Sequence, residues 1–361
     1  MIVRTVYFTQ RGKETAERLF ETLQGQGAPA DCTVSGAGPI RYVPEYRAKE
    51  QGLTEWTRES MELHLPILFV GACGIAVRHV APFVSDKMSD SPVLVMDEAG
   101  DFVIPILSGH LGGANELARV FAQALKAQPV ITTATDVNHT FSVDVFAARN
   151  GLAIRNRLGI KEVSSAVLAG RKLTVCIDRE RILVDEALPE LFEEVPYPGA
   201  DGADIDILIT DEPELDGQAR IVLTPRHLVI GMGCRRGVPF ENLRALLLRV
   251  MEDYGKSEED VLRELFAVAS IDKKADERGL QVLAQYYHVP LCTYSAEQLE
   301  AVEGEFASSA FVQSKVGVAN VCERSALLTC EGDGELTVRK LTHEGMTLAA
   351  AWRRGRIRSW K

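Results

Sequence analysis

The sequence FVIPILSGHLGGANELARVFAQALKAQPVITTATD, at residues 102–136, contains two strand-like segments that flank a helix-like segment. Residues 102–107 are apolar, and residues 115–126 have the apolar spacing of an amphipathic helix. Residues 129–132 form the next predicted strand, and a glycine-rich turn joins the first strand to the helix. This order favours a mostly parallel sheet that is covered by helices on both faces.

The same alternation of strands and helices extends over most of the chain. Further strands are predicted at residues 2–8, 66–70, 93–96, 172–178, 204–210, 228–232, 290–293 and 336–341. Further helices are predicted at residues 13–23, 240–254 and 258–269. We therefore expect an α/β protein of three units with mostly parallel sheets: an N-terminal unit at residues 1–136, a smaller middle unit at residues 137–226 and a C-terminal unit at residues 227–361.

The composition is typical of a globular protein and argues against several classes of function. Of the 361 residues, 46% are hydrophobic and 25% are charged, and the net charge of −11 argues against a nucleic-acid partner. The longest apolar run, residues 65–77, is too short to span a bilayer, and the first residues lack the pattern of a signal peptide. We therefore expect a cytoplasmic protein with no membrane partner.

Cysteine and histidine spacing gives no sign of a metal site. The seven cysteines include no C-x-x-C pair. Five of the histidines are scattered along the chain without the spacing of metal ligands, and we expect structural or exposed roles for them: His64, His139, His227, His288 and His343. The end of the chain is basic, which fits either a solvated tail or attraction to an anionic ligand; its residues are Arg353, Arg354, Arg356, Arg358 and Lys361.

The glycine-rich turn before the helix is the strongest candidate for a binding site. Ser108 and His110 precede the glycines Gly112 and Gly113. Free N–H groups at a helix N-terminus suit an anion, and ligands of open α/β sheets bind at the carboxyl ends of strands. The turn is neither a P-loop nor a dinucleotide fingerprint, because its glycines run G-x-x-G-G and no Gly-Lys-Ser/Thr closes it.

Polar side chains on either side of this turn extend the candidate site. Asn115 and Glu116 follow the glycines. If the strand at residues 129–132 is adjacent, its polar end would lie at the same edge as His110, bringing there Thr132, Thr133 and Asp136. The alternative is that Thr135 or Asp136 caps the next helix.

Two further glycine-rich turns carry cationic side chains. Residues 71–79, GACGIAVRH, contain Arg78, and Lys87 follows shortly after. Residues 231–237, GMGCRRG, contain Arg235 and Arg236, whose forked donors suit carboxylates or phosphates. The polar turn SIDKKADE adds Lys273. These residues either bind an anionic ligand or are ordinary surface charges.

Taken in order, these motifs resemble the cobalt-precorrin-5A hydrolase family of anaerobic cobalamin biosynthesis. The matching stretches cover nearly the whole chain and are GACGIAVR at 71–78, SDKMSD at 85–90, VMDEAG at 95–100, LSGHLGGANELA at 107–118, ITTATD at 131–136, GMGCRRG at 231–237, ASIDKKADE at 269–277 and SKVGVANVCE at 314–323. The resemblance is weakest in the first 50 residues and in the middle unit.

The resemblance implies a three-part enzyme and a reaction. The substrate is a cobalt-corrinoid precursor with a δ-lactone; water opens the lactone, and a two-carbon unit leaves as acetaldehyde to give cobalt-precorrin-5B. The cobalt belongs to the substrate, so no cofactor of the protein is expected. Transient contacts with neighbouring pathway enzymes are also expected. The C-terminal third resembles a unit that occurs as a separate protein in the aerobic pathway.

This chemistry suggests roles for the motif residues. The substrate is a polyanion, so a protein of net charge −11 needs local donors, for which we predict Arg78, Lys87, Arg235, Arg236, Lys273 and Lys315. His110 or Glu116 is the candidate base for water, with Asp136 as a third catalytic candidate. Backbone N–H groups of residues 112–115 are candidates for the oxyanion site. The remaining predicted substrate contacts are Ser108, Gly112, Gly113, Asn115, Thr132 and Thr133.

Two other functions stay open. A non-catalytic tetrapyrrole carrier would need the basic donors but neither His110 nor Glu116. A nucleotide-dependent transferase is favoured by the glycine turns alone, although a P-loop and the strict dinucleotide spacing are missing. For the hydrolase we expect the site in a cleft between the N- and C-terminal units.

Overall fold

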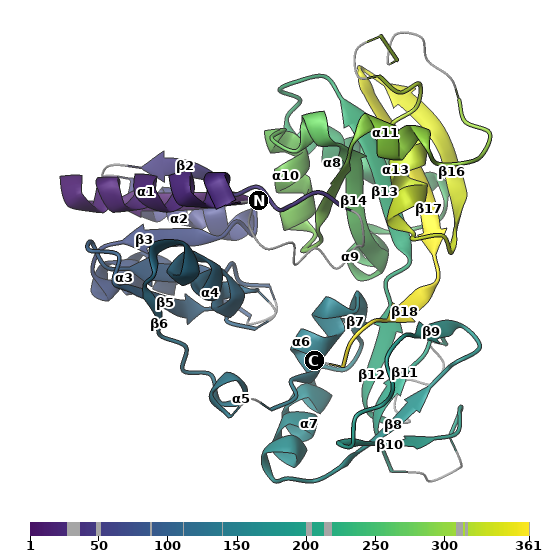
Figure 1. Ribbon diagram of the computed structural model, residues 1–361, viewed down its shortest axis with the longest axis horizontal. Helices are drawn as coiled ribbons and strands as arrows, with labels where there is room; N and C mark the ends of the chain where they lie inside the picture. The colour runs from purple at the N-terminus through teal and green to yellow at the C-terminus, as the bar shows by residue number, and fades with distance from the viewer. Residues whose placement is uncertain are drawn as a thin grey trace.

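The described part of the chain folds into three larger sheets covered by helices and one small two-stranded sheet, which confirms the predicted α/β class (Figure 1). The structure is a computed structural model, and it describes residues 1–26, 37–47, 52–86, 89–110, 112–138, 140–199, 204–212, 219–307, 313–314 and 317–360. The N-terminal unit lies at the left of Figure 1, the C-terminal unit at the upper right and the middle unit at the lower right. None of the helices within the described ranges is long and apolar enough to cross a membrane.

The N-terminal unit contains a six-stranded sheet of order β2-β1-β3-β4-β5-β6. Its strands are β1 (Ile2–Tyr7), β2 (Val43–Arg47), β3 (Ile67–Val70), β4 (Val93–Met96), β5 (Phe102–Leu107) and β6 (Gln128–Pro129). The first four strands are parallel, whereas β5 runs antiparallel to β4, and β6 is parallel to β5. The sheet is therefore only mostly parallel, as predicted, and β5 and β6 end at the edge where the other strands begin.

Helices cover both faces of this sheet because the strands carry apolar side chains on both faces. One face packs against α1 (Gln10–Gln26) and α4 (Ala114–Leu125). The other packs against α2 (Leu53–Glu62) and α3 (Cys73–Val80), which continues into the 3-10 turn η1 (Ala81–Phe83). Successive strand residues such as Leu68 and Phe69 point to opposite faces, and both are fully buried.

The middle unit contains a five-stranded sheet of order β10-β8-β11-β12-β7. Its strands are β7 (Leu152–Ile154), β8 (Leu173–Ile177), β10 (Phe192–Val195), β11 (Ile205–Ile209) and β12 (Ala219–Pro225), of which only β7 pairs antiparallel. Two helices pack on one face, α6 (Val143–Arg149) and α7 (Leu158–Leu168). A short helix, α5 (Ala134–Val137), lies in the connection from the N-terminal unit.

The C-terminal unit contains a five-stranded sheet of order β15-β14-β13-β17-β16. Three strands are parallel, β13 (Leu228–Cys234), β14 (Leu265–Ile271) and β15 (Leu291–Tyr294), and an antiparallel hairpin follows, β16 (Gly334–His343) and β17 (Met346–Arg353). One face packs on α8 (Phe240–Asp253) and α10 (Arg278–Tyr286), and the other on α13 (Cys322–Thr329). Shorter elements are α9 (Glu258–Glu264), η3 (Asp272–Lys274) and α11 (Ala296–Glu300).

The helix predicted at residues 258–269 is too long. Ser257 forms the expected N-cap, and Asp260 completes a capping box with it. The helix ends at Glu264, however, and Leu265–Ile271 is the buried central strand β14. The small apolar residues of this segment fit between β13 and β15 and are buried on both faces, so packing overrides the helical spacing.

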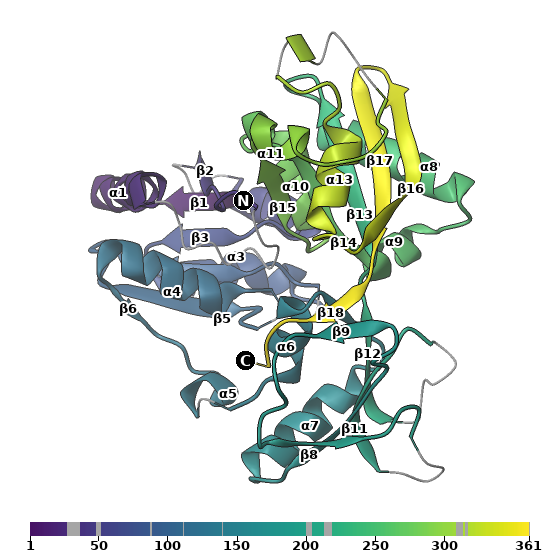
Figure 2. The same cartoon turned by 45° about the vertical axis from the view of Figure 1, so that its right-hand side comes forward.

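The C-terminal segment packs against the middle unit, which corrects the reading of a solvated basic tail. Gly355–Ile357 forms β18, which pairs with β9 (Ile182–Val184). Figure 2 shows this yellow strand passing from the C-terminal unit to the middle unit. Trp360 is only 4% exposed and stacks on Phe146, with ring centroids 5.1 Å apart. The prediction assigned these residues to the third unit, but they complete the core of the second.

The N-terminal and C-terminal units are also in direct contact. The Gln285 side chain donates to the carbonyl of Ile2 over 2.8 Å and accepts from the Ile2 N–H over 2.9 Å. Glu45 forms an ion pair with Arg278 at 2.6 Å. Ile2 and Leu65 are buried in the same cluster as α8 and α10. Packed side chains therefore form this contact, beside a small pocket of about 70 Å³ that residues of both units line.

Candidate active site at the junction of the N-terminal and middle units

Parallel pairing of β5 and β6 brings the two predicted polar turns together. The His110 Nε2 atom lies 2.8 Å from Asp136 Oδ2. Asn115 Nδ2 donates to the same Asp136 oxygen over 2.9 Å and to Thr133 Oγ1 over 3.0 Å. The expectation that Thr133 and Asp136 share an edge with His110 is met, because both strands end there. Thr132 lies beside them but is exposed.

A residue that the sequence analysis missed completes this cluster. Asp144, in the first turn of α6, places its Oδ2 atom 3.3 Å from His110 Nδ1. Its other oxygen accepts from the Ser142 hydroxyl and from the Val145 N–H, the latter over 3.1 Å. The acidic first turn after Ser142 marks a helix start in the sequence, but nothing there indicates a contact with His110. The candidate site thus joins the N-terminal and middle units.

Charged groups of alternating sign run through the cluster. Arg119 on α4 contacts both Asp136 and Glu116, the latter at 3.3 Å. The hydrogen bond that His110 donates to Asp144, together with that to Asp136, raises the pKa of His110 against the effect of burial. Burial acts to raise the pKa of Asp136, but hydrogen bonds from Arg119 and His110 outweigh it and lower that pKa. The same balance of burial against the His110 contact lowers the pKa of Asp144.

The contacts of the His110 ring bear on its predicted role as a general base, which stays a prediction. Both of its ring nitrogens face carboxylate oxygens, which only accept hydrogen bonds when ionised. The two carboxylates and the raised pKa favour the imidazolium form of the ring, which has no lone pair to abstract a proton and can instead donate one. Glu116 has a 44% exposed side chain and stays the candidate base from the sequence.

The glycine turn uses most of its N–H groups internally. The N–H of Gly113 donates to the His110 carbonyl over 2.9 Å, and that of Ala114 donates to the Ser108 carbonyl over 3.1 Å. The N–H of Asn115 donates to the Gly109 carbonyl over 2.9 Å. These groups are therefore not free for the predicted oxyanion site, because the turn folds back on itself before α4.

The predicted cation of the first glycine turn lies elsewhere on the same unit. Gly71 follows β3, and because β5 is antiparallel, the carboxyl end of β3 lies at the edge opposite to Ser108. Arg78 is exposed on α3. Lys87 lies outside the described residues. The GACG and LSGH turns therefore lie at opposite edges of the sheet.

The C-terminal cations gather at a separate edge. Because β13 and β14 are parallel, the turns that carry Arg235, Arg236 and Lys273 lie side by side. Arg236 pairs with Asp276 at 3.1 Å, and its side chain is 71% exposed. Lys315 lies outside the described residues. These cations belong to the C-terminal unit, whereas His110 contacts the middle unit. The expected site between the first and third units stays a prediction.

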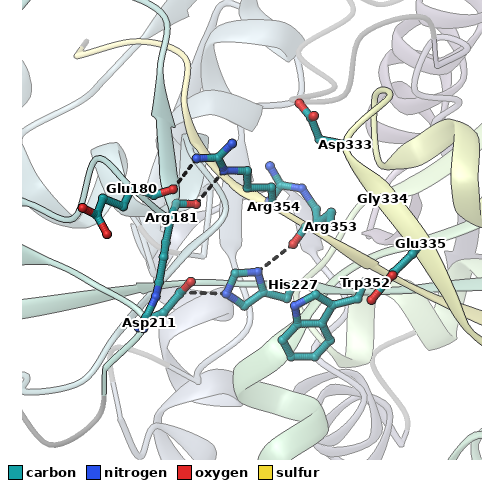
Figure 3. A pocket seen from close by; sticks show the side chains of 10 residues that line it. All are labelled: Glu180, Arg181, Asp211, His227, Asp333, Gly334, Glu335, Trp352, Arg353 and Arg354. Atoms are coloured by element: carbon teal, nitrogen blue, oxygen red, sulfur yellow. Dashed lines mark hydrogen bonds and ion pairs between the residues drawn. The ribbon is translucent and has the colours of Figure 1, made fainter.

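A cavity of about 530 Å³ lies between the middle and C-terminal units (Figure 3). His227 at its wall bonds Asp211 over 2.8 Å and the Arg353 carbonyl over 2.7 Å, and its ring stacks on Trp352. Arg354 donates to backbone carbonyls across the same cavity. These contacts agree with the structural role expected for His227.

Comparison with known proteins places the whole fold in one class. The chain matches the family models Cobalamin synthesis G N-terminal at residues 55–136, Cobalamin biosynthesis central region at 141–229 and Cobalamin synthesis G C-terminus at 228–351. It is an α/β protein of the cobalamin synthesis G class.

Individual relatives narrow this class. The cobalt-precorrin-5A hydrolase of Salmonella typhimurium is 37% identical, over 82% of this chain and 84% of the relative, and that of Priestia megaterium is 30% identical, over 77% and 76%. The chain therefore belongs to the cobalt-precorrin-5A hydrolase family. A solved cobalamin biosynthesis protein G homolog from Sulfolobus solfataricus covers 97% of this chain and 96% of its own length, with 21% identity and a TM-score of 0.41. The solved protein CobE is 37% identical over 35% of this chain and 89% of its own, with a TM-score of 0.32.

Proposed function

We propose that this protein is a cobalt-precorrin-5A hydrolase of cobalamin biosynthesis. The observation that carries the proposal is the 37% identity to a relative of that name over 82% of this chain. The polar cluster at the end of β5 and β6 supports it, because it holds a proton donor and carboxylates in one partly buried place.

The reaction consumes one water and releases acetaldehyde. Water adds to the lactone carbonyl, the ring C–O bond breaks, and the leaving oxygen takes a proton to become a hydroxyl. That hydroxyl then loses its proton as the adjacent C–C bond breaks to give acetaldehyde. The electron pair of this bond enters the conjugated macrocycle, which gains a proton. The cobalt is part of the substrate, and we propose no cofactor of the protein because the macrocycle itself accepts the electrons.

The cluster suggests how the residues divide this work. The imidazolium of His110 donates the proton to the leaving lactone oxygen, and Glu116 takes the proton from the attacking water. Asp136 and Asn115 hold His110 and the turn in place. The cationic turns of Arg78, Arg235, Arg236 and Lys273 stay proposed contacts for carboxylates of the substrate, because a net charge of −11 requires local donors, although these turns lie at edges other than that of His110.

The remaining features of the proposal concern organisation and setting. We propose boundaries between the three units near residues 136 and 226. The last residues of the chain pack on the middle unit through β18. A cytoplasmic location and transient contacts with neighbouring pathway enzymes fit a substrate that is itself a biosynthetic intermediate.

Anaerobic incubation with cobalt-precorrin-5A tests the function. Acetaldehyde is trapped, and the macrocycle is weighed by mass spectrometry. The hydrolase should release acetaldehyde and leave a ring that is lighter by the two-carbon fragment net of water. His110→Gln should abolish most turnover, whereas His343→Gln, with its 39% exposed side chain, serves as the matched control. An unchanged ring that stays bound to the protein would instead favour a carrier.

A further inference from the structure

We infer that Asp144 of the middle unit is a positioning residue for His110, so that the middle unit completes a catalytic site whose motifs all lie in the N-terminal unit. The inference deepens the proposed function and rests on it for the reaction. The contact that carries it is that between Asp144 Oδ2 and His110 Nδ1, at 3.3 Å.

Asp144 is itself firmly placed. Its side chain is 11% exposed, and its second oxygen is held by the Ser142 hydroxyl and by the Val145 N–H. One oxygen is thus fixed by the start of α6, and the other points at the imidazole. A carboxylate held in this way restricts rotation of the ring and leaves Nε2 on the side of Asp136 and Thr135, which lies 3.1 Å from Nε2.

The two carboxylates around His110 are not equivalent. Asp136 is shared with Arg119 and Asn115, so most of its charge is compensated within the N-terminal unit. Asp144 has His110 as its cationic partner within the described part of the chain. Among the residues that the structure describes, Asp136 on the N-terminal side and Asp144 on the middle side contact the ring, Arg119 pairs with Asp136, and Glu116 pairs with Arg119. Asp144 therefore supplies the less compensated negative charge beside the imidazole.

The variant Asp144→Asn tests this assignment because it keeps the size of the side chain and removes its charge. Arg157→Gln is the matched control: Arg157 pairs with Asp86 at 2.6 Å, so it also links the N-terminal and middle units, but it does not contact His110. Asp144→Glu keeps the charge and should therefore retain part of the proton affinity of His110 and part of the turnover that Asp144→Asn loses.

The first readout needs no substrate. The His110 ring is followed by NMR as a function of pH and assigned with His110→Gln. In Asp144→Asn its proton affinity should fall about tenfold or more, since a neighbouring opposite charge shifts a pKa by about one unit or more. Arg157→Gln should leave the titration unchanged. An unchanged titration in Asp144→Asn, or an equal shift in both variants, would overturn the inference.

The second readout is turnover of cobalt-precorrin-5A. For Asp144→Asn, kcat should fall about 10–100-fold with a much smaller change in KM, and the alkaline limb of the pH profile should move with the NMR titration. If the wild type is active and Asp144→Asn turns over substrate equally fast, the positioning role is overturned and the proposed function stands. A shifted titration in a protein whose wild type releases no acetaldehyde would support the coupling and overturn the proposed function.

Discussion

Gly112 has no room for a side chain. A Cβ atom built there would lie 2.4 Å from the Cβ and 2.8 Å from the carbonyl oxygen of Ser108. Ser108 itself has a positive φ of 55°, and its hydroxyl donates to the Asp90 carbonyl over 2.7 Å. Gly113 differs: its φ is +82°, but a Cβ there would meet open space. The turn that presents His110 therefore depends on the absence of one methyl group.

Gly112→Ala should distort this turn, whereas Gly113→Asn should be tolerated because asparagine accepts the left-handed conformation. We expect Gly112→Ala to lower the free energy of unfolding by about 1–3 kcal/mol, as overpacking does, and to reduce acetaldehyde release. Urea denaturation and the turnover assay measure the two effects. Equal stability and activity of the two variants would contradict this account of the turn.

Glu323 is a fully buried carboxylate in the SKVGVANVCE motif. It accepts from the N–H of Ala307 over 3.1 Å, from the N–H of Lys340 over 2.9 Å and from the side chain of Asn320. Three donors thus surround the Glu323 carboxylate. Its role in the motif is structural, because it holds together the segments that flank α13.

Glu323→Gln should lower the free energy of unfolding by about 1–3 kcal/mol, because the new NH₂ group faces donors and leaves one of them unsatisfied. Urea denaturation gives the change in midpoint at constant slope. Glu303→Gln is the control, since Glu303 is exposed. A midpoint that moves no further in Glu323→Gln than in the control would argue that water replaces the lost acceptor.

The residues of the site were partly predictable. His110, Asn115 and Asp136 follow neighbouring strands, and strand order was enough to place them together. Asp144 was not predictable, because its contact depends on how two units pack. The raised pKa of His110 depends largely on that contact, so the sequence indicated the residue but not the environment that favours its protonated form.

At the level of elements, the direction of β5 explains why the first two glycine turns lie apart. Periodicity does not encode strand direction. Loop length does: residues 97–101 link β4 to β5, and a parallel crossover needs about a dozen residues or more. The Asp97 side chain closes this turn by accepting from the N–H groups of Phe102 over 2.7 Å and of Asp101 over 2.9 Å. The short turn was therefore an available signal for an antiparallel pair.

Trp360 makes the C-terminal segment an anchor of the middle core. Trp360→Ala should lower the free energy of unfolding by about 3–5 kcal/mol, because a large buried ring packed on Phe146 and Phe192 is removed. Arg356→Ala in the same segment should change it by no more than about 1 kcal/mol, since the Arg356–Asp185 pair is partly exposed. Denaturation and limited proteolysis of the middle unit test this. Similar losses in both variants would mean that the ion pairs hold the segment.

At the scale of the whole molecule, the sequence predicted three α/β units but not how they contact one another. The packing of Ile2 against Gln285 and of His110 against Asp144 depends on complementary surfaces that periodicity does not describe. The return of β18 to β9 likewise joins distant segments, which no local pattern reveals.

Docking of the N-terminal unit on the middle unit should depend on pH in both directions. The raised pKa of His110 adds stability that is complete below its unfolded value of about 6.5 and is lost as pH rises through the folded pKa. The lowered pKa values of Asp136 and Asp144 add stability that is present above about 3.8 and is lost as pH falls through the folded values. The link should therefore be strongest between about pH 4 and pH 6.5.

Urea denaturation of wild type and His110→Gln over this range measures that link. The difference in free energy of unfolding between wild type and His110→Gln should be largest between about pH 4 and pH 6.5 and should shrink at pH 9 and at pH 3. Hydrogen bonds to charged groups contribute about 1.5–3 kcal/mol each, which bounds the maximum. A difference that is independent of pH would show that His110 acts through its shape alone.

The pairing of β18 with β9 also sets an order of events during synthesis. β9 ends at Val184 and β18 begins at Gly355, so the ribosome makes the whole C-terminal sheet before the strand that completes the middle core. At about 5–20 residues per second, this interval lasts on the order of ten seconds to half a minute. During that time the pocket for Trp360 between Phe146 and Phe192 is open to water, and a nascent chain stalled in this window would expose it to chaperones and proteases.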